Sequence, residues 1–142
     1  MGLDVFSEAW AAAWAAEINA SAAYHAAGAR WESAFVLVMD PDPALGVTEQ
    51  RSVYVDLSHG ECRVGRAAKP DDLASAPYVL KAPAAVWKQV LGGELEPVGA
   101  MMMGLMELSR GALVSLAPHV PAATELLAAA SRVDATLPEG WA

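Results

Sequence analysis

The sequence has little cysteine, few basic residues and no long uninterrupted apolar run. Its single cysteine, Cys62, excludes an intramolecular disulfide and fits a reducing compartment, so we expect a cytoplasmic protein. Nine basic residues face 17 acidic ones, giving a net charge of −8. This balance would repel a phosphate backbone and disfavours anionic membranes, so we expect no nucleic-acid partner. No stretch of about 18 uncharged apolar residues occurs, so we expect no transmembrane helix and no stable membrane insertion.

The sequence also lacks the motifs of common catalytic and metal-binding sites. No glycine-rich phosphate loop follows a predicted strand, and there is no Gly-x-Ser-x-Gly elbow. His25, His59 and His119 lie in separate segments without metal-ligand spacing, so we expect no metal and no cofactor. His59 and Cys62 could form a nucleophilic pair, but a turn histidine beside a strand cysteine is the more common arrangement. We therefore predict a protein that is not an enzyme.

Apolar residues are abundant, at 55% of the chain, whereas charged residues make up 18%. A chain of 142 residues has the usual size of one domain. We expect residues 1–132 to form that single domain and residues 133–142 to form a C-terminal tail. The excess of apolar over charged side chains requires either an unusually apolar surface or an internal cavity.

Periodic apolar residues predict helices near the amino terminus. Residues 4–19 form the first of these predicted helices, with Asp4 as its N-cap. Ser21 is placed to cap a second, shorter helix that ends at Gly28. The apolar face of the first helix carries Phe6, Trp10, Trp14 and Ile18.

Strand patterns follow in the middle of the chain. Residues 35–39 are continuously apolar, which is typical of a central strand covered on both faces. Residues 51–57 alternate between apolar and polar side chains and form a predicted hairpin with residues 62–66. Residues 68–76 are predicted to be a polar loop, and residues 78–82 form another strand.

Prolines and glycines divide the last third into short elements. Pro83 and Gly92 bound a predicted helix, and Pro97 begins a second one. We expect a fifth strand at residues 105–109, a short helical segment at 112–117, and a final helix from Pro121 to about Arg132. This order predicts an α+β (α/β) fold, with one sheet and helices gathered mostly on one face.

The same third is rich in methionine, a residue that suits walls accommodating apolar ligands of variable shape. Four of the six methionines lie between residues 101 and 106. Methionine also fills gaps in ordinary cores. Helices interrupted by Pro97, Pro118 and Pro121 could be arranged around a space. Composition alone does not decide between a packed core and a cavity.

Three stretches in order, residues 78–82, 87–97 and 103–111, resemble the sterol carrier protein 2 family. The hairpin around residues 53–64 resembles earlier strands of the same family. The resemblance covers roughly residues 30–130 and is greatest to the compact, stand-alone bacterial members. The order and spacing of these loose motifs carry the resemblance, because none of them is diagnostic alone. The sequence departs from the family at Glu107, where many members have lysine, which puts an anionic head-group contact there in doubt.

This resemblance implies a mainly antiparallel five-stranded sheet, covered on one face by helices and enclosing an apolar tunnel. It also implies non-catalytic binding and intracellular transfer of a lipid-like ligand, such as a fatty acid, fatty acyl-CoA, sterol or phospholipid. An interaction module with a collapsed cavity remains an alternative, self-associating as a homodimer or assisting an enzyme. The lipid-binding positions implied by the family motif are Trp87, Val90, Leu91, Leu95, Val98, Met101, Met102, Leu105, Met106, Leu113, Leu116, Leu126 and Leu127.

Overall fold

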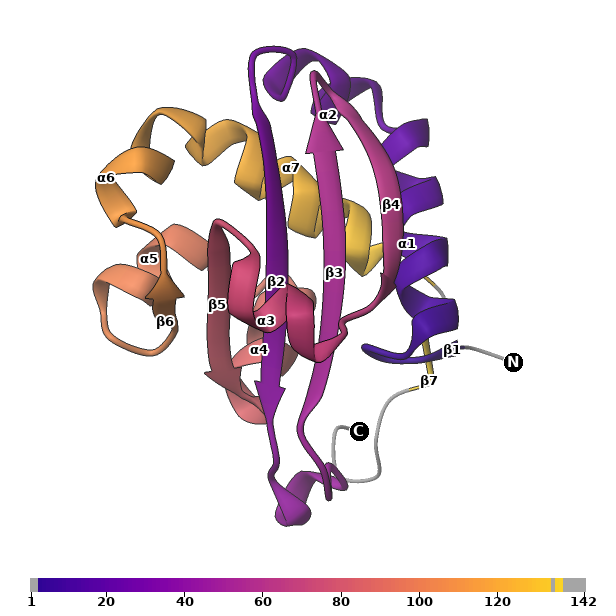
Figure 1. Cartoon of the computed structure of the whole chain (residues 1–142). Helices are drawn as coiled ribbons and strands as arrows, with labels where there is room; N and C mark the ends of the chain where they lie inside the picture. The colour runs from indigo at the N-terminus through magenta and orange to yellow at the C-terminus, as the bar shows by residue number, and fades with distance from the viewer. Residues whose placement is uncertain (1–2, 134, 137–142) are drawn as a thin grey trace.

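The protein is built on one five-stranded sheet with the strand order β4-β3-β2-β5-β6 (Figure 1). The computed structural model describes residues 3–133 and 135–136. β2 and β5 run parallel, and every other neighbouring pair is antiparallel, which confirms the predicted mainly antiparallel sheet. The strands are β2 (Glu32–Asp40), β3 (Arg51–Ser58), β4 (Glu61–Ala67), β5 (Tyr78–Pro83) and β6 (Glu107–Arg110).

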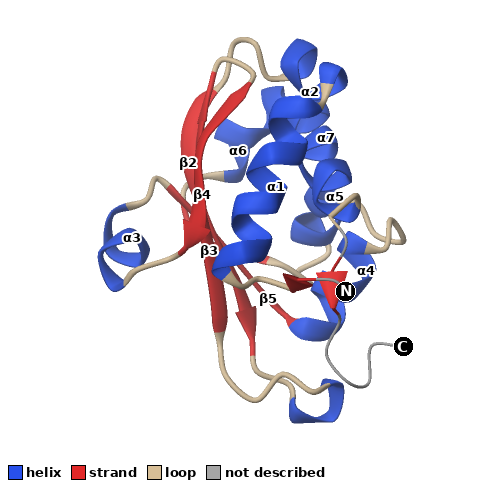
Figure 2. Cartoon of the chain, turned by 90° about the vertical axis from the view of Figure 1, so that its right-hand side faces the viewer, coloured by secondary structure: helices blue, strands red, loops and turns tan. Residues whose placement is uncertain are grey.

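Most helices lie on one face of the sheet, as predicted, while α3 lies on the other (Figure 2). The helices are α1 (Glu8–Ala20), α2 (Ala22–Ala27), α3 (Pro70–Ser75), α4 (Ala84–Leu91), α5 (Pro97–Met102), α6 (Leu113–Leu116) and α7 (Val120–Ser131). Two 3-10 turns, η1 (Pro43–Leu45) and η2 (Ala117–His119), join neighbouring elements. The short strands β1 (Leu3–Asp4) and β7 (Ala135–Thr136) pair in parallel.

The first helix begins later than the sequence predicted. Ser7, not Asp4, is the N-cap of α1, and its hydroxyl accepts a hydrogen bond from the backbone N–H of Trp10 at 3.2 Å. Phe6 has a φ of 61°, a left-handed conformation that cannot continue a helix toward the amino terminus. The second helix agrees with the prediction, because Ser21 caps α2 and Gly28 ends it.

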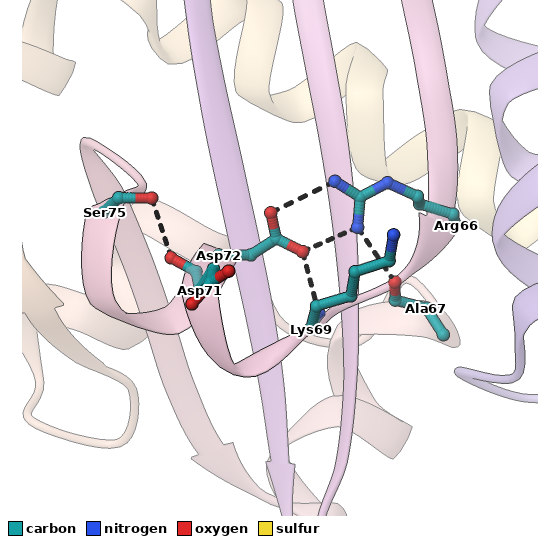
Figure 3. Close-up of polar contacts among 6 residues, drawn as sticks. All are labelled: Arg66, Ala67, Lys69, Asp71, Asp72 and Ser75. Atoms are coloured by element: carbon teal, nitrogen blue, oxygen red, sulfur yellow. Dashed lines mark hydrogen bonds and ion pairs between the residues drawn. The ribbon is translucent and has the colours of Figure 1, made fainter.

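The outer face of the sheet carries a helix where the sequence predicted a polar loop. α3 begins at Pro70, and the Asp72 carboxylate accepts a hydrogen bond from the backbone N–H of Lys69 at 2.7 Å (Figure 3). Arg66 donates two hydrogen bonds to the same carboxylate, at 2.6 and 3.1 Å, which ties α3 to β4. Apolar periodicity could not predict α3, because this helix has six residues and only one large apolar side chain, that of Leu73.

The Asp72–Arg66 pair should make the stability of the protein depend on pH. The hydrogen bond from Arg66 lowers the pKa of Asp72 below its ordinary value of 3.8. This stabilisation is therefore present above pH 3.8 and is lost as the pH falls through the lower folded-state pKa. We expect Asp72→Asn to lower the free energy of unfolding by roughly 1 kcal/mol at pH 7, and by less near pH 2.

Urea unfolding at both pH values measures this difference. Asp71→Asn is the matched control, because Asp71 is an exposed acid one residue earlier in the same helix. Equal losses of stability for the two variants at pH 7 would show that the Asp72–Arg66 pair contributes nothing specific.

The central strand β2 is covered on both faces, as its continuous apolar run predicted. Val36 and Val38 pack beneath α3 together with Val79 and Ala76. Phe35, Leu37 and Met39 face the main core, which lies between the sheet and the larger set of helices. Four tryptophans are buried in that core, and two of them also join elements through their indole N–H groups.

The carboxy-terminal elements follow the predicted order with small shifts. β6 begins at Glu107 instead of residue 105, because Gly104 turns the chain with a φ of 76°. The segment Leu113–Ser131 has 19 residues and a mean hydropathy of 1.3, long and apolar enough to cross a membrane by length and composition alone. Its α7 part contacts α1, α2, α4 and α5 in the fold. The predicted tail, 133–142, lies largely outside the described residues, and the domain bounds remain a prediction.

Candidate functional site

An apolar cavity of ≈ 30 Å³ lies between the sheet and helices α5, α6 and α7. All of its lining residues are apolar, so it offers no hydrogen-bond partner from a side chain except the indole of Trp31. An interior space of this kind suits hydrocarbon and not a polar substrate. The lining residues are Trp31, Phe35, Leu37, Leu80, Pro97, Val98, Met101, Leu116, Ala123, Leu126 and Leu127.

A second hollow, an open groove of ≈ 220 Å³, lies beside α7 and the loop from α4 to α5. Pro97 and Leu127 line both the groove and the cavity, so the two spaces meet at these side chains. Movement of the Leu127 side chain would therefore join the two spaces. The other lining residues of the groove are Val90, Gly93, Leu95, Glu96, Thr124, Ala128 and Ser131.

The polar groups of this groove are few, and most are already engaged. The Glu96 carboxylate caps α5 by accepting hydrogen bonds from the backbone N–H groups of Val98 and Gly99, at 3.1 and 2.8 Å. The Ser131 hydroxyl donates to the carbonyl of Leu91 at 2.6 Å. Among the described residues that line the cavity and the groove, none is lysine or arginine.

The structure divides the predicted lipid-binding residues into three groups. Seven of them line the cavity or the groove: Val90, Leu95, Val98, Met101, Leu116, Leu126 and Leu127. Three lie away from both spaces within or against the core, namely Trp87, Leu91 and Met106. The remaining three, Met102, Leu105 and Leu113, are exposed to solvent. The ligand-binding role of these residues remains a prediction, and the family motif did not separate the inward side chains of a short helix from its outward ones.

The wall that the sheet contributes to the cavity was not predicted from the sequence. Phe35 and Leu37 of β2 and Leu80 of β5 line it, and Leu37 pairs with Leu80 across the parallel strands. An alternating strand would have shown which residues face inward, but residues 35–39 are apolar on both faces. Trp31 also lines the cavity, and its ring stacks on that of His119 with centroids 4.9 Å apart.

His59 and Cys62, which could have formed a nucleophilic pair, are not in a catalytic arrangement. Cys62 is buried in β4, and its thiol donates to the carbonyl of Val64 at 3.2 Å. Burial raises the pKa of this thiol to about 11, so it stays protonated and unreactive near neutral pH. His59 is exposed and lies near the Ala29 carbonyl and the Glu32 carboxylate instead. Within the described part of the chain, no group of three or more histidine, cysteine or acidic residues could hold a metal ion.

Comparison with known proteins finds a family model and solved structures that are similar to this chain. Residues 15–109 match the SCP-2 sterol transfer family. A crystal structure of sterol carrier protein 2 is 42% identical, with a TM-score of 0.83, and the match covers 92% of this chain and 99% of that one. The solution structure of a conserved hypothetical protein of Thermus thermophilus, described as possibly a sterol carrier protein, is 40% identical with a TM-score of 0.83, over 98% and 95% of the two chains.

No curated protein matches the chain in sequence. The family match nevertheless covers more than half of the 142 residues, and the two structural matches cover nearly all of them. These matches imply lipid or sterol binding and transfer. The chain belongs to the SCP-2 sterol transfer family.

Proposed function

We propose that this protein binds an apolar, lipid-like ligand without altering it and transfers it within the cell. The observation that carries this proposal is the cavity between the sheet and α5–α7, which has exclusively apolar lining residues. Each ligand methylene removed from water contributes about 0.8 kcal/mol, so a long hydrocarbon chain needs few polar contacts. The buried, protonated Cys62 supports a carrier and not an enzyme that uses this thiol.

Uptake of such a ligand requires the helices to separate. A volume of ≈ 30 Å³ is far below the roughly 300–1,000 Å³ of typical small-molecule pockets. The walls contributed by α5 and α6 are the best placed to move, because these helices have only six and four residues. Pro118 and Pro121 interrupt the hydrogen-bonded backbone where α6 is joined to α7. We propose that opening at this junction enlarges the cavity and connects it to the groove across Leu127.

The charges of the groove favour a ligand with an uncharged polar end. Glu96 is the charged residue among those lining the groove, and no described cation lies there to neutralise a carboxylate or a phosphate. The Thr124 hydroxyl can hydrogen-bond a neutral head, and the Ser131 oxygen, whose O–H already donates to a backbone carbonyl, can still accept a hydrogen bond from it. Among the ligands implied by the family, an alcohol-type head such as that of a sterol therefore suits the groove better than the phosphates of acyl-CoA.

Ala123→Phe should test whether the cavity is the ligand site. Ala123 lines the cavity from α7 and is half-buried, so a phenyl ring there can occupy the ligand space without crowding the deep core. We expect this variant to bind a fluorescent fatty alcohol at least ~10-fold more weakly than the unmodified protein, a loss of about 1.4 kcal/mol. Ala12→Phe, at an exposed position of α1, is the matched control and should bind normally.

Native mass spectrometry of the purified protein provides an independent measurement. Bound small-molecule mass, identified by lipid extraction, would support the carrier, and its absence after addition of excess lipid would favour the interaction module with a collapsed cavity. Equal affinity of Ala123→Phe and Ala12→Phe for the fluorescent alcohol would show that the ligand lies elsewhere.

A comparison of ligands with the same chain length tests the head-group preference. Hexadecanol should bind more tightly than hexadecanoyl-CoA, and replacing Glu96 by serine should narrow this difference. Serine can still cap α5 but carries no charge, so helix capping is kept while the repulsion is removed. Displacement of the fluorescent alcohol at constant ionic strength measures both affinities. Tighter binding of the acyl-CoA to the unmodified protein would contradict the preference.

A further inference from the structure

A further hollow, of ≈ 260 Å³, lies beside α3 on the face of the sheet that is turned away from the cavity. Figure 2 shows α3 on this outer face, whereas α5, α6 and α7 lie on the other. Apolar side chains of three elements line the hollow, namely Val38 of β2, Val79 of β5 and Leu73 of α3. They belong to the small core beneath α3. We call this space the outer hollow, and the sheet separates it from the cavity.

The rest of the lining of the outer hollow is polar and carries positive charge. Its members are Gln50, Lys81, Ser109 and Arg110. Two of these four residues are cations, in a chain that has only nine basic residues against 17 acidic ones. Among the described residues that line the outer hollow, none is an acid. The groove beside α7 has the opposite character, because its charged lining residue is Glu96.

Arg110 is held in place by a contact that does not neutralise its charge. It lies opposite Val79 in the register of β5 and β6, so its side chain is on the outer face. The guanidinium donates a hydrogen bond to the Ala74 carbonyl of α3. Within the described part of the chain, Arg110 forms no ion pair. A guanidinium has five N–H groups, so donors remain for an anion in the hollow.

Two acids near Lys81 limit the charge that the outer hollow can accept. The Asp40 carboxylate lies 3.7 Å from the Lys81 ammonium and accepts a hydrogen bond from Gln50 at 3.3 Å. Glu107 is exposed and lies opposite Lys81 in the register of β5 and β6. Lys81 is therefore partly neutralised, whereas Arg110 keeps its charge. This balance fits a ligand with one negative charge and disfavours a phosphate monoester, which carries about two.

We propose that the outer hollow binds a small monocarboxylate with a short apolar chain. The carboxylate would lie between Arg110 and Lys81, because a planar guanidinium matches a carboxylate with two parallel hydrogen bonds. The apolar chain would lie on the three apolar side chains of the lining. A volume of ≈ 260 Å³ holds roughly nine water molecules, so the ligand has on the order of eight non-hydrogen atoms. This site is separate from the cavity and does not depend on the proposed carrier function.

Titration with 4-methylpentanoate, followed by NMR of the ¹⁵N-labelled protein, tests this site. We expect the largest shifts at the backbone amides of Leu73, Val79 and Ser109. The uncharged isostere 4-methylpentanamide should bind at least ~10-fold more weakly, because it cannot pair with the two cations. Raising the salt concentration from about 0.02 to about 0.5 M should narrow this difference, since salt screens exposed charges.

Charge variants of the lining identify the residues that hold the carboxylate. We expect Arg110→Gln to weaken binding of 4-methylpentanoate at least ~10-fold. Lys81→Gln should weaken it by about 3-fold, because Asp40 already pairs with this lysine. Lys88→Gln is the matched control, because Lys88 is a half-buried lysine of α4, which lies with the other helices on the cavity side. It should bind the carboxylate normally.

Glu107→Gln separates ligand binding from the support of α3. Replacing Arg110 also removes its contact with Ala74, so a loosened α3 would reduce binding in the same way. Removal of the Glu107 charge leaves that contact intact and should tighten binding of the carboxylate by about 2-fold, with no change for the amide. Weaker or unchanged carboxylate binding by Glu107→Gln would contradict the electrostatic basis of the site.

Two other results would overturn the proposal. Equal affinity of 4-methylpentanoate and its amide would show that the cations do not hold the ligand. Shifts confined to cavity residues such as Leu37 and Leu126 would place the carboxylate in the cavity instead. Binding of the fluorescent alcohol, measured separately, reports on the carrier function, so failure of the outer hollow and failure of that function are distinguishable.

Discussion

Replacing Trp87 by alanine should lower the free energy of unfolding by about 3–5 kcal/mol, the usual cost of removing a large buried aromatic side chain. Trp87 has no exposed surface, and its ring lies 5.1 Å from that of Phe6, centroid to centroid. Its indole N–H donates to the Val38 carbonyl at 2.8 Å, so the one side chain fastens α4 to the central strand. Truncation would leave a cavity and would remove the hydrogen bond to the Val38 carbonyl that connects α4 to β2.

Urea unfolding at pH 7, followed by circular dichroism, measures this loss. Trp87→Phe serves as the graded comparison, because phenylalanine keeps much of the apolar volume but cannot donate the hydrogen bond. We expect it to lose about 1–3 kcal/mol, between the unmodified protein and the alanine variant. A Trp87→Ala variant within about 1 kcal/mol of the unmodified protein would show that Trp87 lies in a loose ligand site, as the family motif implied, and not in the packed core.

Gly65→Ala should also destabilise the protein strongly, by about 1–3 kcal/mol or more, because it overpacks a contact between two backbones. A Cβ atom at position 65 would lie 2.5 Å from the Ala11 carbonyl oxygen and 2.8 Å from the Ala15 Cβ. The carbonyl belongs to the α1 backbone, so relief requires the whole helix to move away from β4. The buried side chains of α1, including Trp10 and Trp14, would lose contacts in that movement.

Gly104→Ala is the matched control for this substitution. Gly104 has a φ of 76° and nothing within 4 Å of an added Cβ, so alanine there costs only backbone strain, about 1 kcal/mol. Thermal and urea unfolding of the two variants should rank Gly65→Ala as the less stable. The reverse order would mean that α1 adjusts to β4 at little cost and that the close approach at Gly65 does not determine their packing.

The sequence predicted the secondary structure best where a single residue, such as a helix cap or a proline, determines where an element begins or ends. The Ser21 cap, the Gly28 terminus and the proline that begins α5 require only the chemistry of their immediate neighbours, and the structure confirms each. Residues 35–39 likewise predicted a strand covered on both faces. α3 was not predicted, because tertiary contacts stabilise it. Arg66 of β4 binds Asp72, and Val36 and Val38 of β2 lie beneath the helix.

The candidate site was predicted only on its helical side. The family motif implied Val98, Met101 and Leu126, but it also implied Met102 and Leu113, which point into solvent. In a helix of four to six residues, a change of one position rotates a side chain by about 100°, from the cavity to the surface. Similarity to a family motif identifies such a segment as a whole, but it does not specify which of its side chains face the cavity.

The sequence by itself determined the class of fold, the order of the five main strands and of every helix except α3, and the apolar character of the last third. Those properties follow from local propensity, from periodicity and from resemblance to a family. The tertiary structure decided which of the apolar side chains face each other across the cavity, which pack in the core, as Trp87 does, and which are exposed to solvent, as Met102 and Val114 are. The physical reason is that apolar residues are driven from water without direction, so only the packing of distant segments selects between core, cavity and exposed surface.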